Sequence, residues 1–215
     1  MKIVEIKNVS KRFGDNIIFD DVSLSIEQGS CVGFVGENGA GKSVLFKMIA
    51  GLVEADKGQI YVKDQLVGRN ENFPTNIGFF VNQPSFVDIF DGFENLKLLA
   101  EIKNSIDDKK IRDTMIAVGL DPDNKTKFKS YSTGMKQKLA IAQAIMEDQD
   151  LVLLDEPFNA LDTKSNLEII NVINKLKEED KTIFLTSHQE EYLRKLCNEI
   201  YLFNDNKIKR IDNKI

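Results

Sequence analysis

A glycine-rich loop between two apolar runs constrains the fold of this chain more than any other stretch. Residues 36–43 read GENGAGKS, after the apolar run 31–35 and before the apolar run 44–50, which Gly51 ends. The two runs predict a buried strand and a short buried helix. Gly, four residues and then Gly-Lys-Ser between a strand and a helix is the pattern of a loop whose backbone N–H groups converge on phosphate oxygens. The pattern therefore predicts a nucleotide-binding α/β core.

Two side chains of this loop carry most of its chemistry. Lys42 supplies a positive charge for the β- and γ-phosphates of a nucleotide, and the hydroxyl of Ser43 is placed to bind Mg²⁺. The helix that follows adds the positive end of its dipole. Further contacts with the nucleotide are expected from Gly36, Asn38, Gly39, Ala40, Gly41 and Val44. An ordinary glycine-rich turn is the alternative interpretation, and the flanking strand and helix disfavour it.

Length and composition limit the other interpretations. The chain has 215 residues, 42% hydrophobic and 29% charged, with a net charge of −5. This length predicts one domain, or one domain with an inserted subdomain, and the acidic balance argues against nucleic acid as a partner. No apolar run approaches the roughly 18 residues of a membrane span, and the first residues lack the apolar core of a signal peptide. Cys31 and Cys197 lie in apolar patterns, which predicts buried thiols in a reducing cytosol and no disulfide framework.

Apolar patterns along the rest of the chain predict strands first and helices later. Near the start, short runs at 3–9, 17–19 and 22–26 with polar turns between them predict an antiparallel sheet. Helical periodicity over 93–119, and again after Ser132, predicts helices inserted between the strands of the core. The final residues predict a β-hairpin.

Acidic and polar residues follow two strongly apolar runs. The run 151–154 ends in Asp155 and Glu156, and the run 182–186 is soon followed by His188, the only histidine. Side chains at the carboxyl ends of core strands lie where open α/β sheets bind ligands. Asp155 suits indirect coordination of Mg²⁺, Glu156 suits polarising a water molecule, and His188 is placed for contact with a γ-phosphate.

Three other features have two interpretations each on the residues alone. Phe13 lies in the polar turn predicted over 10–16, where a core or turn role is favoured over stacking on a base. Ser132 begins a helix, where a plain helix cap is favoured over an anion site. The apolar stretch 86–90 is equally well a partner surface or internal packing of the next subdomain.

The order of these motifs resembles that of the ATP-binding subunits of ATP-binding cassette (ABC) transporters along essentially the whole chain. Residues 36–43 match the phosphate loop of that family, residues 151–157 its second nucleotide motif with the catalytic glutamate, and residues 159–162 its D-loop, which includes Asp162. His188 matches the switch histidine. The resemblance implies that the family's ATP and Mg²⁺ are the cofactors of this chain.

The same resemblance implies an architecture. It predicts an α/β fold, with a P-loop NTPase core of mostly parallel sheet, an N-terminal antiparallel β-subdomain and an inserted α-helical subdomain. The core with its β-subdomain is expected over residues 1–84 and 146–215, and the helical subdomain over about 85–145.

Residue roles are implied in the same way. Phe13 falls where the family stacks an aromatic ring on adenine, which favours that role over a turn aromatic. Residues 131–135 read YSTGM and resemble the signature usually written Leu-Ser-Gly-Gly-Gln. In the family, the serine and second glycine of the signature, here Ser132 and Gly134, contact the γ-phosphate held by the opposite subunit.

The sequence departs from the family pattern at two places. Thr133 replaces the first glycine of the signature, so the close backbone approach there is in question. The glutamine expected after the apolar run 77–81 is displaced: Asn82 falls in its position and Gln83 is adjacent. Both are candidates for contacting Mg²⁺ and water, and Asn82 is shorter than glutamine by one methylene.

The implied function is a Mg²⁺-dependent ATPase that powers transport through a separate membrane-spanning subunit. Two copies, expected to be identical in the ATP state, would sandwich two ATP molecules on the cytoplasmic face of the membrane. The stretch 84–90 resembles that of subunits in peptide-antibiotic (lantibiotic or bacitracin type) export and immunity systems. Two alternatives stay open: a soluble cassette ATPase such as a translation or DNA-repair factor, and an ATP-gated regulatory module with little turnover.

Overall fold

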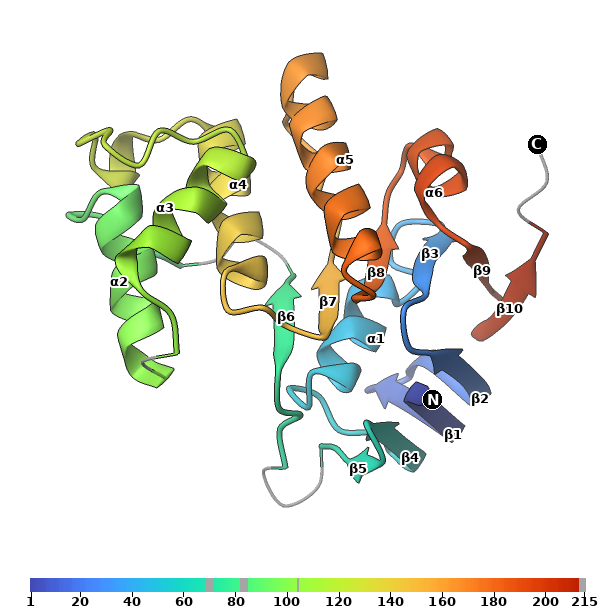
Figure 1. Ribbon diagram of the computed structural model, residues 1–215. Coiled ribbons are helices and arrows are strands. Elements are labelled where there is room, and N and C mark those ends of the chain that lie inside the picture. The colour runs from blue at the N-terminus through green and yellow to red at the C-terminus, as the bar shows by residue number, and fades with distance from the viewer. Residues whose placement is uncertain (69–71, 82–84, 104, 213–215) are drawn as a thin grey trace.

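The protein is described here by a computed structural model that covers residues 1–68, 72–81, 85–103 and 105–212. Figure 1 shows a central sheet with helices beside it and a second, smaller sheet near the N-terminus. The central sheet has six strands in the order β10-β9-β3-β8-β7-β6. Its strands are β3 (Cys31–Gly36), β6 (Ile77–Phe80), β7 (Leu151–Leu154), β8 (Thr182–Thr186), β9 (Glu199–Asn204) and β10 (Lys207–Ile211). All neighbours pair in parallel except β10, which forms an antiparallel hairpin with β9.

The second sheet is antiparallel, as the sequence predicts, but its strands are longer than expected. Its order is β2-β1-β4-β5, with β1 (Lys2–Phe13), β2 (Asn16–Glu27), β4 (Lys57–Val62) and β5 (Gln65–Leu66). The predicted polar turn over 10–16 is wrong, because β1 continues to Phe13, and the two strands predicted at 17–19 and 22–26 are one strand. Register shifts along β1 and β2 let these strands keep pairing through their polar residues.

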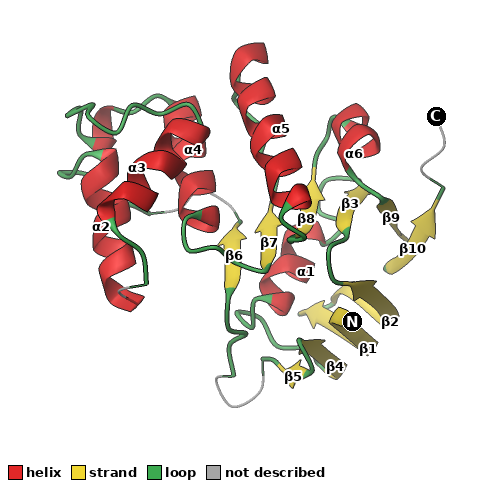
Figure 2. Cartoon of the chain, viewed as in Figure 1, coloured by secondary structure: helices red, strands yellow, loops and turns green. Residues whose placement is uncertain are grey.

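The central sheet has one apolar layer on each face because successive residues of its strands point to opposite sides. Leu151 and Leu153 pack with α1 (Lys42–Ile49) and the antiparallel sheet. Val152 and Leu154 pack on the other face, where α5 (Thr163–Glu178) and α6 (Glu190–Leu196) lie. Figure 2 shows these helices beside the strands. All residues of β7 and β8 are buried, which explains their continuous apolar sequences.

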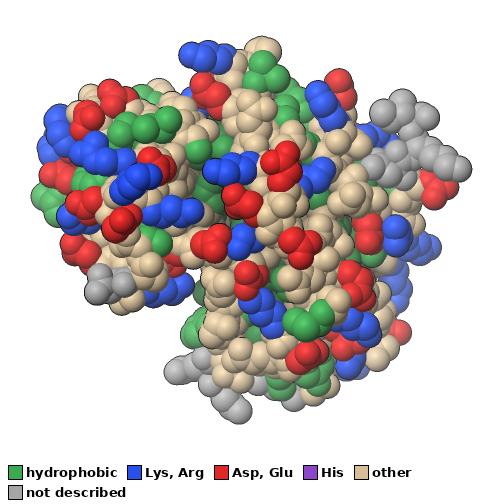
Figure 3. All heavy atoms as spheres, in the orientation of Figure 1, with side chains coloured by type: hydrophobic (Ala, Val, Ile, Leu, Met, Phe, Trp, Pro, Cys, Tyr) green, Lys and Arg blue, Asp and Glu red, His purple; other side chains and the backbone are tan. Residues whose placement is uncertain are grey.

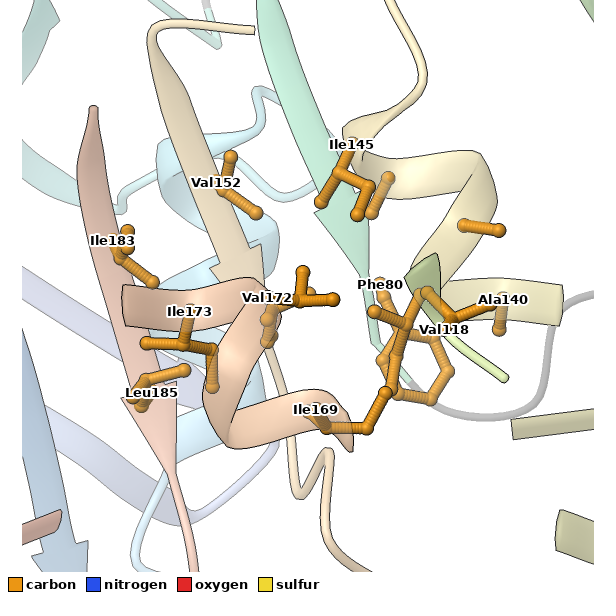
Figure 4. Packing of buried hydrophobic residues seen from close by; sticks show 14 of the residues in the cluster. Phe80, Val118, Ala140, Ile145, Val152, Ile169, Val172, Ile173, Ile183 and Leu185 are labelled. Atoms are coloured by element: carbon orange, nitrogen blue, oxygen red, sulfur yellow. The ribbon is translucent and has the colours of Figure 1, made fainter. Parts of the chain in front are cut away.

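The helical part of the chain lies beside the β6 edge of the central sheet (Figure 1). It contains α2 (Gly92–Lys103), α3 (Asp108–Ala117), the short 3-10 helix η1 (Phe128–Ser130) and α4 (Thr133–Ile145). Phe80 of β6 belongs to the same buried cluster as Val118 and Ala140, which joins the helical part to the sheet (Figure 4). The boundaries between the core and the helical subdomain, at residues 84 and 146, stay a prediction.

The apolar stretch 86–90 is partly packed inside the protein and partly exposed, and its predicted role as a partner surface stays a prediction. Phe86 packs edge-to-face on Phe128, with ring centroids 5.0 Å apart. Val87 and Ile89 are exposed, Ile89 by 67%. The chain therefore uses one residue of this stretch for internal packing and leaves others on the surface.

The two cysteines are buried, as their apolar surroundings in the sequence predict. Cys31 and Cys197 form no disulfide with each other, and the thiol of Cys31 donates to the sulfur of Cys197 at 3.7 Å. Within the described residues, no helix combines the length and the apolar character needed to cross a membrane. On the face drawn in Figure 3, acidic and basic side chains are interspersed.

Candidate functional site

The carboxyl ends of three neighbouring parallel strands meet at one edge of the central sheet. β3 pairs with β8 and β8 with β7, so Gly36, Asp155 and Ser187 emerge at that same edge. A cavity of about 440 Å³ lies there. Its lining includes residues of the glycine-rich loop together with Asp155, Glu156 and His188. The fold therefore brings the separate sequence motifs into one site.

The glycine-rich loop needs glycine for two physical reasons. Gly39 and Gly41 have φ values of +83° and +104°, which disfavour any other residue. A Cβ atom on Gly41 would also lie 2.5 Å from Cγ2 of Ile18 on β2. The antiparallel sheet thus packs directly against the loop, which brings backbone N–H groups and the start of α1 to the cavity.

Lys42 is the first residue of α1 and is only 8% exposed. Its Nζ atom donates to the backbone carbonyls of Gly36, at 2.7 Å, and Glu37, at 3.0 Å. The ammonium group is thereby held across the loop, at the wall of the cavity. Two of the three N–H donors of this buried ammonium are used, and the third is available to a phosphate oxygen, which lysine binds as a point charge.

Ser43 and Asp155 form a pair of oxygen donors beside this lysine. The hydroxyl of Ser43 donates to Oδ2 of Asp155. The other carboxylate oxygen, Oδ1, accepts from Oγ1 of Thr186 at 2.7 Å. A hydroxyl and a carboxylate are the hard oxygen ligands that Mg²⁺ prefers, and Mg²⁺ usually takes its remaining ligands from phosphates and water. Among the described residues, no group of three or more His, Cys, Asp and Glu side chains is arranged so that it could hold a metal ion.

Glu156 lies next to Asp155 in an unusual backbone conformation, with a φ of +54°. Its backbone N–H donates to Oγ1 of Thr186 at 2.8 Å, and its Oε2 atom accepts from the backbone N–H of His188 at 3.1 Å. The imidazole Nε2 of His188 lies 3.3 Å from Oε1. Burial raises the pKa of Glu156, and this effect exceeds the lowering by His188. A carboxylate of raised pKa is a better proton acceptor than an exposed one.

Two residues of this site carry no sequence signal of their own. Thr186 ends β8 and bridges Asp155 to the backbone of Glu156. Gln137, on α4, donates from Nε2 to the backbone carbonyl of Glu156 at 2.8 Å. Only the apolar run before Thr186 and the one-turn spacing of Gln137 from Thr133 hint at their positions.

The predicted signature residues lie elsewhere. Ser132 and Gly134 line a second hollow, of about 400 Å³, together with Asp162. Ser132 accepts a hydrogen bond from the backbone N–H of Met135 at 3.2 Å, so it is the cap of α4. Asp162 caps α5 by accepting from the backbone N–H of Ser165 at 2.7 Å. Neither Ser132 nor Gly134 lines the cavity at the glycine-rich loop.

The remaining predicted residues are placed differently. Phe13 ends β1 and is 50% exposed, with Nζ of Lys11 5.0 Å from its ring centroid. It does not line the cavity at the glycine-rich loop. Asn82 and Gln83 lie outside the described residues.

Comparison with known proteins identifies the family. The ABC transporter family matches residues 19–159. YybJ of Bacillus subtilis, named an uncharacterized ABC transporter ATP-binding protein, is 35% identical over 91% of this chain and 90% of its own length. The bacitracin transport ATP-binding protein BcrA of Enterococcus faecalis is 32% identical over 94% of this chain and 67% of its own length.

Solved structures agree on the fold. The dimeric structure of a post-hydrolysis state of the ATP-binding cassette MJ0796, bound to ADP and Pi, superimposes with a TM-score of 0.87 over 99% of both chains. Its sequence identity of 24% supports the fold alone. The predicted α/β fold with parallel core, antiparallel subdomain and inserted helices is therefore confirmed. The chain belongs to the ABC transporter family, as one of its ATP-binding subunits.

Proposed function

We propose that this chain hydrolyses ATP with Mg²⁺ to power transport through a separate membrane-spanning partner. One observation carries the proposal. The loop with Lys42, the oxygen pair of Ser43 and Asp155, and the buried carboxylate of Glu156 all line or border one cavity. Phosphoryl transfer needs this combination of charge neutralisation and an oriented water molecule.

Each group has a distinct role in this proposal. The loop N–H groups and Lys42 bind the β- and γ-phosphates and neutralise their charge. Ser43 and Asp155 would hold Mg²⁺, directly or through water, and the ion would neutralise charge that develops on the phosphates. Asn82 and Gln83 remain proposed contacts of the same ion.

Glu156 is the proposed base for the attacking water. Its raised pKa and its position at the cavity wall suit it to accept the proton of that water. His188 holds the carboxylate through its backbone N–H and lines the same cavity, and we propose that its side chain contacts the γ-phosphate. Phe13 is proposed to stack on the adenine, because half of its surface is free for a ring.

A second copy of the chain is proposed to complete each site. Ser132 and Gly134 lie in a separate hollow, so within one chain they do not line the cavity that holds Lys42. In a pair of identical chains arranged head to tail, each hollow would meet the γ-phosphate bound by the other copy. The dimeric form of the structurally similar cassette MJ0796 supports this arrangement. ATP would then close the dimer, and hydrolysis would open it.

The partner and the location follow from this function. A subunit that drives a membrane-spanning partner lies on the membrane surface, and we propose the cytoplasmic face, where ATP is available. The similarity to BcrA supports a place among peptide-antibiotic transport systems. We also propose that residues 1–84 and 146–215 form the nucleotide-binding core with its β-subdomain, and that about residues 85–145 form the helical subdomain.

The test is ATP hydrolysis by the purified chain, with Mg²⁺ and with EDTA, alone and with proteins recovered from detergent-solubilised membranes. We expect Mg²⁺-dependent turnover that Lys42→Ala abolishes through loss of ATP binding, measured by calorimetry. Unchanged ATP affinity of Lys42→Ala would refute the role of the lysine. Recovery of no membrane protein, with intact turnover, would favour a soluble ATPase.

A further inference from the structure

Helix α4 is in contact with both hollows of the molecule. Gln137 lines the cavity at the glycine-rich loop, and Ser132 and Gly134, at the tip of the helix, line the second hollow. Thr133, in the first turn of the helix, lines both. One rigid element therefore reaches the ATP site of its own chain and the surface proposed to meet the nucleotide of a second copy.

The backbone of Glu156 is held at both of its polar groups by side chains from other elements. Its N–H donates to Thr186 of β8. Its carbonyl accepts from the side chain of Gln137 of α4 at 2.8 Å and from the backbone N–H of Asn159 at 3.2 Å. The left-handed φ of +54° is unfavourable for a glutamate, so the surrounding contacts must maintain it. Gln137 is thus one of two side chains that fix this conformation.

The carboxylate itself is only partly held. Oε2 accepts from the backbone N–H of His188, whereas Oε1 is buried and accepts no hydrogen bond within the described part of the chain. Among those residues, the imidazole Nε2 of His188, 3.3 Å away, is the only basic side-chain nitrogen at ion-pair distance from Oε1. The position of this carboxylate therefore depends strongly on where the backbone of Glu156 is held.

We propose that Gln137 is a positioning residue for hydrolysis. It holds the carbonyl of Glu156, and so keeps the carboxylate where it can accept a proton from the attacking water. The inference deepens the proposed function and rests on Glu156 acting as the base. Because Gln137 belongs to α4, a displacement of this helix when its tip meets a nucleotide would carry the Glu156 backbone with it.

The test replaces the amide donor and leaves the shape of the side chain nearly unchanged. Gln137→Leu removes the donor, and Gln137→Glu places an acceptor against the carbonyl. We expect the kcat for ATP to fall about ten-fold in Gln137→Leu and further in Gln137→Glu, because misplacing a reacting group slows chemistry. The KM for ATP should change less than about two-fold, because Gln137 acts on the chemical step.

Gln143→Leu is the matched control. Gln143 lies on the same helix, is half-buried, and lines neither hollow. Its kcat should equal that of the wild type. Adding Gln137→Leu to Glu156→Gln should leave the ATP-dependent dimer of that variant intact on size exclusion, which separates positioning from a loss of folding.

The outcomes separate the two proposals. A kcat of Gln137→Leu within two-fold of the wild type would overturn this inference and leave the proposed function standing. A parallel loss of kcat, ATP affinity and the ATP-dependent dimer would assign Gln137 a purely structural role, which also overturns it. A wild-type chain without Mg²⁺-dependent turnover would refute the proposed function, and this inference with it.

Discussion

The two hollows of this protein differ in how complete they are. The cavity at the glycine-rich loop has its charged groups bonded within the chain: Lys42 to loop carbonyls, Asp155 to Ser43 and Thr186, and Glu156 to His188. The hollow around Ser132 and Gly134 has the side-chain caps of α4 and α5, and the ammonium of Lys138, which also lines it, is already paired with Glu168. The first hollow has several charged groups held in place around one cavity, whereas the second has a helix N-terminus, whose backbone N–H groups and dipole favour an anion. This difference is what we expect if one chain contributes two unlike halves to two ATP sites, as the proposed function requires.

Removing the base tests the completed half and has the largest expected effect. Glu156→Gln keeps the shape of the side chain but takes no proton, so kcat should fall at least about 100-fold while ATP binding persists. Because ATP is then bound without turnover, the variant should accumulate as a dimer on size exclusion with ATP and Mg²⁺. A monomeric elution profile under these conditions would count against the two-copy site.

Blocking the other half tests whether it acts on a second copy. Ser132→Arg places a bulky cation at the tip of α4, which should abolish hydrolysis but leave ATP binding by the isolated chain intact. A mixture of Ser132→Arg and Lys42→Ala chains should regain part of the activity, because one composite site has both halves unaltered. If the mixture stays as inactive as its components, the signature acts within its own chain or not at all.

Thr186 tests how much the internal bonding of the first hollow matters. Thr186→Val keeps the volume but leaves Oδ1 of Asp155 and the N–H of Glu156 without this partner. A buried polar group left unpaired costs about 1–3 kcal/mol, so we expect a lower unfolding midpoint in urea and a kcat reduced about ten-fold. Thr186→Ser keeps the hydroxyl and serves as the control, with activity near that of the wild type.

The pH dependence of ATP hydrolysis tests how burial in the first hollow affects Glu156. We expect it to be the smallest of these effects. Glu156 must be ionised to accept a proton, and burial raises its pKa above the ordinary value of 4.5. As pH falls through this raised pKa, kcat at saturating ATP should decline, at a higher pH than for an exposed glutamate. A pH–rate profile measures this. A kcat that stays constant until an exposed glutamate would be protonated would contradict burial as the factor that tunes this base.

The sequence predicted the groups that follow directly from a motif. Lys42, Ser43, Asp155 and His188 lie beside apolar runs, and such runs end at the ligand edge of a parallel sheet. Thr186 and Gln137 could not be predicted, because their partners lie about 20 to 30 residues away and only the packing of β7 with β8 and α4 brings them together. The long β1 and β2 strands were missed because bulges conceal the alternation of their residues.

Three things could be read from the sequence alone: the phosphate loop, the polar residues that follow the apolar core strands, and the family to which the chain belongs. These are local patterns, since a motif needs only its neighbours to be recognised. Only the tertiary structure decided that Ser132 and Gly134 lie apart from Lys42, and that α4 contacts Glu156 through Gln137. Both depend on how the inserted helices pack against β6 and the sheet, and that packing joins residues too distant in the chain for any spacing to reveal.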